Sequence, residues 1–250
     1  MNKRVPRVEK LFGILSVVIV IVLWQLTSLR WNHVSFYPTP FKVLKELVNL
    51  LTDGQTYIIL LTSFKRLFIA LAVSTVFGTF FGLFAGLHYQ VAALLKPIVV
   101  ALRTIPVISI VVILLMMYGN VASLYIIIFL LIFPIIYQSQ LDGIRNIDGV
   151  LLEVLKLDCD KCSFPAVRMV FFPLALPHLR TGILQSIGLG IKVLVMAEFI
   201  AQTKISIGRE MIASKNLLNY SNIFAWTLIL VFFVLIVEHY VNKYIKYTKI

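Results

Sequence analysis

The chain has 250 residues, of which 60% are hydrophobic, and its mean hydropathy is +0.96. These values exclude an ordinary water-soluble domain and indicate an all-α integral membrane protein with a single transmembrane domain over residues 1–250. The excess of 23 Lys and Arg over 11 Asp and Glu would suggest a nucleic-acid partner in a soluble protein. Here the basic residues lie beside apolar segments, where they orient a chain in a bilayer, so we expect membrane lipid and no nucleic acid as a partner.

The amino-terminal segment predicts a first membrane span. Four basic residues lie in a tail, residues 1–10, and an apolar run follows over residues 11–29. This pattern also fits a secretory signal peptide, but no small-x-small cleavage site follows it, so we expect a retained helix. A Pro-Thr-Pro motif at residues 38–40 cannot continue a helix, and the amphipathic residues 41–48 are suited to lie in the membrane interface.

The second expected span covers residues 60–87 and contains a stripe of glycines. Gly78, Gly82 and Gly86 recur at every fourth residue, which places them on one face of a helix where another helix can approach closely. We interpret this stripe as a helix-packing surface, because tight packing explains it without a ligand.

Four more apolar segments bring the number of spans to about six. The third, residues 98–118, contains Arg103 and Pro106, and the proline either kinks this helix or marks its start. We expect a tight turn at Gly119-Asn120 before the fourth span. The fourth, fifth and sixth spans are predicted at residues 121–139, 174–200 and 223–242. An even number of spans places both termini on one side, and the distribution of Lys and Arg favours the cytoplasmic side.

The fifth span carries two charged residues, Lys192 and Glu198. A charge at the centre of a span costs about 2.5–3.5 kcal/mol on insertion scales, so each should face a partner or a wet cavity. Because they point roughly 120° apart on a helix, we do not expect them to pair with each other. Two interpretations stay open: together with Arg103 and Pro106 they line a translocation pathway, with Lys192 attracting an anion, or other helices neutralise them. For Glu198 the second interpretation has at least equal weight.

Residues 142–177 form the longest stretch that water can reach on one face, and residues 142–173 of it are expected to form a loop between two spans. Within it, residues 150–157 favour a short amphipathic helix that Asp148 can cap, and about two to three turns are too few to cross a bilayer. This helix either docks a cytosolic protein or merely covers the ends of the helical bundle. Cys159 and Cys162 have the CxxC spacing, but no second CxxC or His pair accompanies them, so we predict no metal site.

The motif Glu153-Val154-Leu155-Lys156, followed by Phe172-Pro173 and the segment to residue 182, resembles the cytoplasmic coupling loop of ABC importer permeases, particularly the nitrate/sulfonate/taurine type. That loop has Glu-Ala-Ala, then Gly, then Leu-Pro. Here Val154 and Leu155 replace the alanines, the glycine position falls near Cys159 or Asp160, and Phe172-Pro173 closes the loop. The Pro-x-Pro motif, the Ser63-x-x-Arg66 entry, the charges of the fifth span and residues 207–226 also resemble this family.

The resemblance implies a type I ABC importer permease fold with a cytoplasmic coupling helix between the fourth and fifth spans. It assigns ATPase coupling to Val150, Leu151, Glu153, Val154, Leu155, Lys156, Asp158, Cys159 and Asp160. The implied partners are a cytosolic ABC ATPase dimer, a second and identical permease subunit, and an extracytoplasmic solute-binding protein. The chain itself binds no cofactor, since ATP and Mg²⁺ belong to the ATPase. Its expected location is a bacterial cytoplasmic (inner) membrane, with multiple passes.

Enzyme motifs are missing from the sequence. It has no GxxxxGK[ST] loop, so the chain is not itself a P-loop ATPase, and GxSxG and HExxH are also absent. The resemblance implies that the chain passes a small solute, anionic by analogy with the subgroup, by alternating access. Two alternatives are kept: a secondary transporter, which should show ion-coupling residues at broken helices, and a non-transporting scaffold, which would tolerate neutralisation of Lys192.

Overall fold

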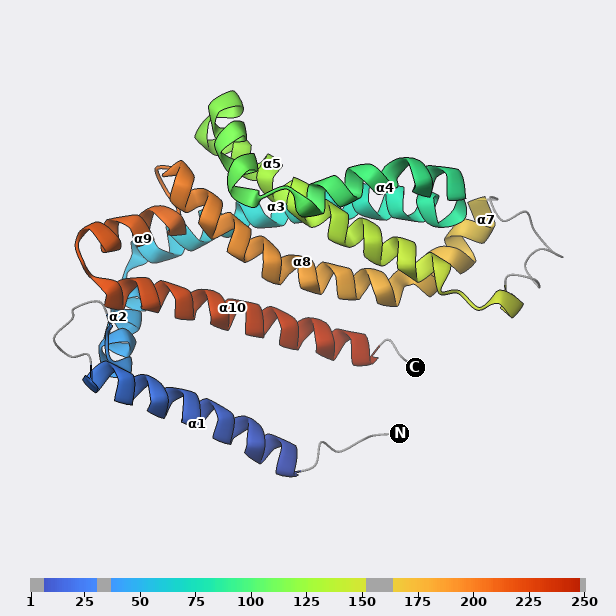
Figure 1. Cartoon of the computed structure of the whole chain (residues 1–250). Coiled ribbons are helices and arrows are strands. Elements are labelled where there is room, and N and C mark those ends of the chain that lie inside the picture. Colours follow the sequence, from blue (N-terminus) through green and yellow to red (C-terminus); the bar gives the residue numbers. More distant parts are fainter. Residues whose placement is uncertain (1–6, 31–36, 152–163, 248–250) are drawn as a thin grey trace. The chain divides into compact units, whose positions relative to one another are not determined.

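The computed structural model describes residues 7–30, 37–151 and 164–247, and every secondary-structure element in these ranges is a helix (Figure 1). Their labels follow Figure 1. The helices are α1 (Arg7–Arg30), α2 (Pro40–Thr52), α3 (Gly54–Leu87), α4 (Tyr89–Thr104), α5 (Val107–Arg145), α7 (Phe164–Ala166), the π-helical turn η1 (Val167–Phe171), α8 (Phe172–Ala201), α9 (Ile207–Asn216) and α10 (Tyr220–Tyr247). The all-α class predicted from the sequence is confirmed.

Five helical segments in the described ranges are long and apolar enough to cross a membrane. They are Leu11–Arg30, Gly54–Leu87, Val107–Arg145, Val167–Ala201 and Tyr220–Val241. The chain is therefore a multi-pass membrane protein. The predicted count of six spans stays a prediction, because most of the expected third and fourth spans lies within the one segment of α5.

The expected third span, residues 98–118, is not one continuous helix. Helix α4 ends at Thr104, Ile105 and Pro106 adopt extended backbone angles, and α5 begins at Val107. Proline disfavours helical angles in the residue before it and has no N–H to donate, so Pro106 separates two helices instead of kinking one.

The turn expected at Gly119-Asn120 is a single-residue break inside α5, where the ribbon folds back (Figure 1). Gly119 has φ 73° and ψ 178°, while helical residues flank it on both sides. A Cβ at this position would meet nothing within 4 Å, so the backbone angle, and not crowding, requires glycine here.

The described chain divides into two compact units. One comprises the chain up to Tyr57 together with Glu210–Phe232, and the other comprises Ile58–Arg209 with the chain from Phe233 onward. In the first unit, Thr39 caps α2 by accepting a hydrogen bond from Lys42 N at 3.3 Å, and Pro40 occupies the first turn. A side-chain cap with proline at the first helical position explains why the Pro-Thr-Pro motif starts a helix here.

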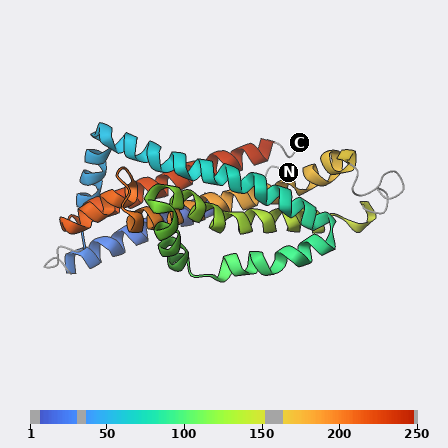
Figure 2. The ribbon, with the colours of Figure 1, turned by 90° about the horizontal axis from the view of Figure 1, so that it is seen from above.

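The second unit has a core between α3, α4, α5 and α8. Figure 2 shows α4 running back beside α5 after the chain leaves α3. Apolar side chains of α3, α4 and α5 form one buried cluster that contains Ala85, Val99 and Phe133. On its other side α5 packs along α8, and Ile132 and Leu194, one from each helix, are fully buried. Helix α5 is thus the central element of this unit.

Candidate functional site

The beginning of the expected coupling stretch is described. Helix α5 continues to Arg145, past the predicted end of the fourth span, and residues 149–151 have helical backbone. The Oδ1 atom of Asp148 accepts a hydrogen bond from Val150 N at 3.1 Å, which is the contact expected of a helix N-cap. Val150 and Leu151 are exposed.

The other residues assigned to ATPase coupling lie outside the described residues, as do both cysteines of the CxxC motif. They are Glu153, Val154, Leu155, Lys156, Asp158, Cys159, Asp160 and Cys162. Their role as a docking helix therefore remains a prediction.

The two ends of this stretch lie against each other. Ile144, near the end of α5, forms a buried cluster with Phe171 of η1 and Ala175 of α8. The approach is close, since a Cβ added to Gly143 would lie 3.0 Å from the Cβ atoms of Ala175 and His178. The chain therefore leaves α5 and enters α8 at one packed contact between these two helices. A force on the stretch would act on α5 and α8 together.

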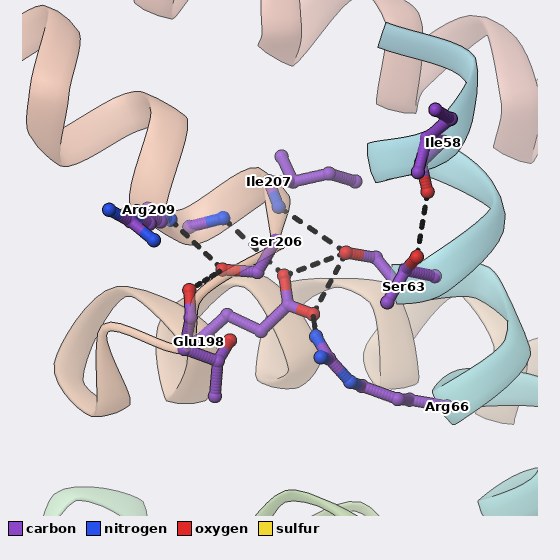
Figure 3. A network of polar contacts seen from close by, with 10 residues as sticks. Ile58, Ser63, Arg66, Glu198, Ser206, Ile207 and Arg209 are labelled. Atoms are coloured by element: carbon purple, nitrogen blue, oxygen red, sulfur yellow. Dashed lines mark hydrogen bonds and ion pairs between the residues drawn. The ribbon is translucent and has the colours of Figure 1, made fainter. Parts of the chain in front are cut away.

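Glu198 lies in a closed network of polar contacts at the far end of α8 (Figure 3). Its Oε1 atom accepts a hydrogen bond from Arg66 Nη1 at 2.7 Å, and the Ser63 hydroxyl donates to the same carboxylate at 2.8 Å. The Glu198 side chain is 0% exposed and that of Arg66 is 8% exposed. An ion pair this deeply buried is tolerated because the remaining carboxylate lone pairs also receive hydrogen bonds.

The same network holds the start of α9. Gly208 N donates to Glu198 Oε2 at 3.4 Å, and Ile207 N donates to Ser63 Oγ at 3.3 Å. The first amides of a helix have no partner within the helix and carry partial positive charge, so a carboxylate stabilises them. A Cβ on Gly208 would collide with the backbone of Phe199, so only glycine permits this approach. Three helices, α3, α8 and α9, are therefore joined at Glu198.

This geometry favours a structural role for Glu198 over a pathway role. The sequence predicted that Glu198 needs a partner, but it did not identify Arg66, which was noted only as part of the Ser63-x-x-Arg66 motif. One signal was available, because both Arg66 and Glu198 are charges within apolar segments and each therefore requires compensation.

The other expected pathway residues do not join Glu198. Lys192 is exposed on α8, and Pro106 is exposed between α4 and α5. Arg103 instead lines a cavity of about 360 Å³ between α4 and α5, which we call the α4–α5 groove; its main lining residues are Tyr89, Lys96, Arg103, Tyr137, Leu141 and Arg145. In the described residues, therefore, these four expected pathway residues do not form one site.

The glycine stripe of α3 lies against α5. A Cβ added to Gly78 would be 2.8 Å from Ile136 Cγ2, one on Gly82 would be 2.8 Å from Gln140 Cβ, and one on Gly86 would be 2.6 Å from Ile144 Cβ. Separations below about 3 Å do not occur between real side chains, so all three positions need glycine for the helices to approach this closely.

Metal binding has no support in the described part of the chain, where no three His, Cys, Asp or Glu side chains are grouped closely enough to hold an ion. Two polar sites in the described residues bear on function, the Glu198 network and the α4–α5 groove. The Glu198 network joins helices, and the α4–α5 groove offers space and positive charge for a ligand.

Comparison with known proteins gives consistent matches. Residues 78–241 match the family model described as "Binding-protein-dependent transport system inner membrane component". The chain is 27% identical to the taurine transport system permease protein of Escherichia coli over 194 residues, which are 75% of this chain and 70% of that protein. It is 24% identical to a putative aliphatic sulfonates transport permease protein of Bacillus subtilis over 220 residues, which are 87% of this chain and 79% of that protein.

Proposed function

Because this chain belongs to the family of binding-protein-dependent transport system inner membrane components, of the sulfonate/taurine/nitrate type, we propose that it is the permease subunit of an ATP-driven importer. In this proposal the chain carries the solute across the membrane by alternating access. The main support is the family match, which begins in α3, runs through the coupling stretch and ends in α10.

We propose that the energy comes from a cytosolic ABC ATPase dimer. In this proposal the dimer, and not this chain, binds ATP and Mg²⁺. The docking surface is the stretch that begins at Asp148, with Glu153 and Leu155 at its centre. The packing at the two ends of this stretch supports the proposal, because Gly143 and Ile144 of α5 lie tightly against Ala175 of α8. A push on a rigidly packed pair of helices is transmitted along both, which is what rocking of rigid bodies requires.

Further partners complete the proposed importer. A second, identical permease subunit forms the other half of the pore, and an extracytoplasmic binding protein delivers the solute. The complex lies in a bacterial inner membrane with both termini of this chain in the cytoplasm, as the distribution of Lys and Arg favours.

The proposed solute is small and anionic, with a sulfonate as the first candidate. The names of the two relatives refer to transport of taurine and of aliphatic sulfonates, which supports this class.

Uptake by cells of the native host tests coupling and solute class together. A deletion strain would be complemented with the wild-type chain, with Glu153→Lys, or with Glu46→Lys as a matched charge reversal on α2. We expect wild type and Glu46→Lys to restore uptake of radiolabelled taurine or ethanesulfonate, and Glu153→Lys to fail although it is present in the membrane. Full uptake by Glu153→Lys would contradict the coupling assignment, whereas absence of sulfonate uptake with wild type would contradict the solute class.

A further inference from the structure

The α4–α5 groove collects positive charge from two helices. Lys96 and Arg103 come from α4, Arg145 comes from the last turn of α5, and no Asp or Glu is among the described residues that line the groove. None of these three cations forms an ion pair with another residue that the structure describes. The groove therefore has three formal positive charges on its wall.

The spacing along α4 lets two of these cations act together. Lys96 and Arg103 are seven residues apart, which is two turns and about 10 Å along a helix, so they lie on one face. Both side chains are long and exposed, and they can converge on one bound group. Arg145 comes from α5, so the cations line the cavity from both of its helices.

The remaining lining suits a small ligand with an apolar body. Ala92, Val99 and Leu141 form an apolar floor and are largely buried, while Tyr89 and Tyr137 add hydroxyls that can donate hydrogen bonds. A volume of about 360 Å³ falls within the roughly 300–1,000 Å³ that small-molecule sites occupy.

Two general effects also favour cations at these positions, but they do not explain why three cations line one cavity. Arg103 and Arg145 each lie in the last turn of a helix, where the negative end of the dipole attracts a cation. Each helix end contributes only about half a negative charge, so three cations leave the groove positive. The bias of Lys and Arg toward one side of a membrane explains basic residues at helix ends, but it does not place three of them around one cavity.

We propose that the α4–α5 groove binds an oxyanion, a sulfonate or phosphate group, carried either by a small solute or by the headgroup of an acidic lipid. This inference does not require transport, because a protein that moves no solute could hold an anion in the same place.

The test uses the full-length protein, purified in neutral detergent, and four variants of it. The groove variant carries Lys96→Gln, Arg103→Gln and Arg145→Gln. The control variant carries Lys42→Gln, Lys45→Gln and Lys215→Gln, which removes the same charge from exposed positions of α2 and α9. Arg103→Gln and Arg103→Lys, which change a single exposed side chain, serve if the triple groove variant fails to fold.

Two measurements separate the possible sources of the anion. Calorimetric titration with ethanesulfonate, against the uncharged ethyl methyl sulfone, tests a small solute. Native mass spectrometry of protein equilibrated with phosphatidylglycerol or phosphatidylcholine tests an acidic lipid.

We expect the charged probe of at least one arm to bind to wild type and its neutral counterpart not to bind. The groove variant should weaken that binding about tenfold or more, the control variant should stay within about twofold of wild type, and Arg103→Lys should retain more binding than Arg103→Gln. The proposal is overturned if neither anion binds to wild type, or if the groove and control variants lose binding equally in both arms.

Discussion

The ion pair at Glu198 allows a quantitative test of the fold. Replacing Arg66 by Met removes the cation 2.7 Å from Oε1 and leaves a carboxylate that is 0% exposed with only Ser63 and an amide as donors. Removing one partner of a buried ion pair costs about 3–5 kcal/mol, because the other charge remains buried. At roughly 2–4 °C per kcal/mol for a chain of this size, the unfolding midpoint should fall by about 6–20 °C.

Thermal unfolding of the detergent-purified protein, followed by near-ultraviolet circular dichroism, measures this shift. The matched control is Lys192→Met, which removes an exposed cation from α8 and should change the midpoint by no more than about 2 °C. The double variant Arg66→Met/Glu198→Met leaves no unpaired charge, so it should be more stable than Arg66→Met alone.

The reasoning fails if Arg66→Met unfolds within about 2 °C of wild type. It also fails if the double variant is no more stable than Arg66→Met, because the loss would then arise from packing and not from a buried, unpaired charge.

Three further predictions concern glycines and a helix cap. Gly86→Leu should lower the unfolding midpoint, because even a Cβ there lies 2.6 Å from α5 and overpacking costs about 1–3 kcal/mol. The control Gly13→Leu has open space around it and should leave the midpoint unchanged. Equal midpoints for the two variants would refute this packing. Gly119→Ala should destabilise by roughly 1–3 kcal/mol, because φ 73° with ψ 178° is a backbone conformation that only glycine adopts readily, and Gly54→Ala should not; an unchanged midpoint for Gly119→Ala would count against the bend in α5. Asp148→Ala should speed amide hydrogen exchange at residues 149–151 by removing the cap, and unchanged exchange would contradict that role.

Hydropathy was sufficient to predict the helical class and that several segments are apolar and long enough to cross a membrane. It was less informative about residues 98–118, because apolar content continues across a backbone break. Pro106 was recognised as a kink or a start, and only the structure shows that α4 ends before it. At Gly119 the sequence indicated a turn, and the structure places it within one residue of α5.

Contacts between distant segments could not be derived from the sequence. Glycine spacing on α3 indicated a close neighbour, but periodicity does not say which helix that neighbour is. The cost of a buried charge showed that Glu198 needs a partner, yet Ser63 and Arg66 lie more than 130 residues earlier in the chain. The α4–α5 groove could not be predicted from the sequence, because it depends on how α4 and α5 pack and bring Lys96, Arg103 and Arg145 to one cavity.

A pull-down from the native host tests most directly whether the chain is coupled to an ATPase at residues 150–160. The tagged protein would be isolated in mild detergent, and everything that accompanies it would be identified by mass spectrometry. We predict a stoichiometric ABC ATPase subunit that is lost when residues 150–160 are replaced by a Gly/Ser linker and retained in Glu46→Lys. If no ATPase accompanies the wild-type chain under conditions that preserve other membrane complexes, the ATP-driven mechanism is contradicted and a secondary transporter or a non-transporting scaffold takes its place.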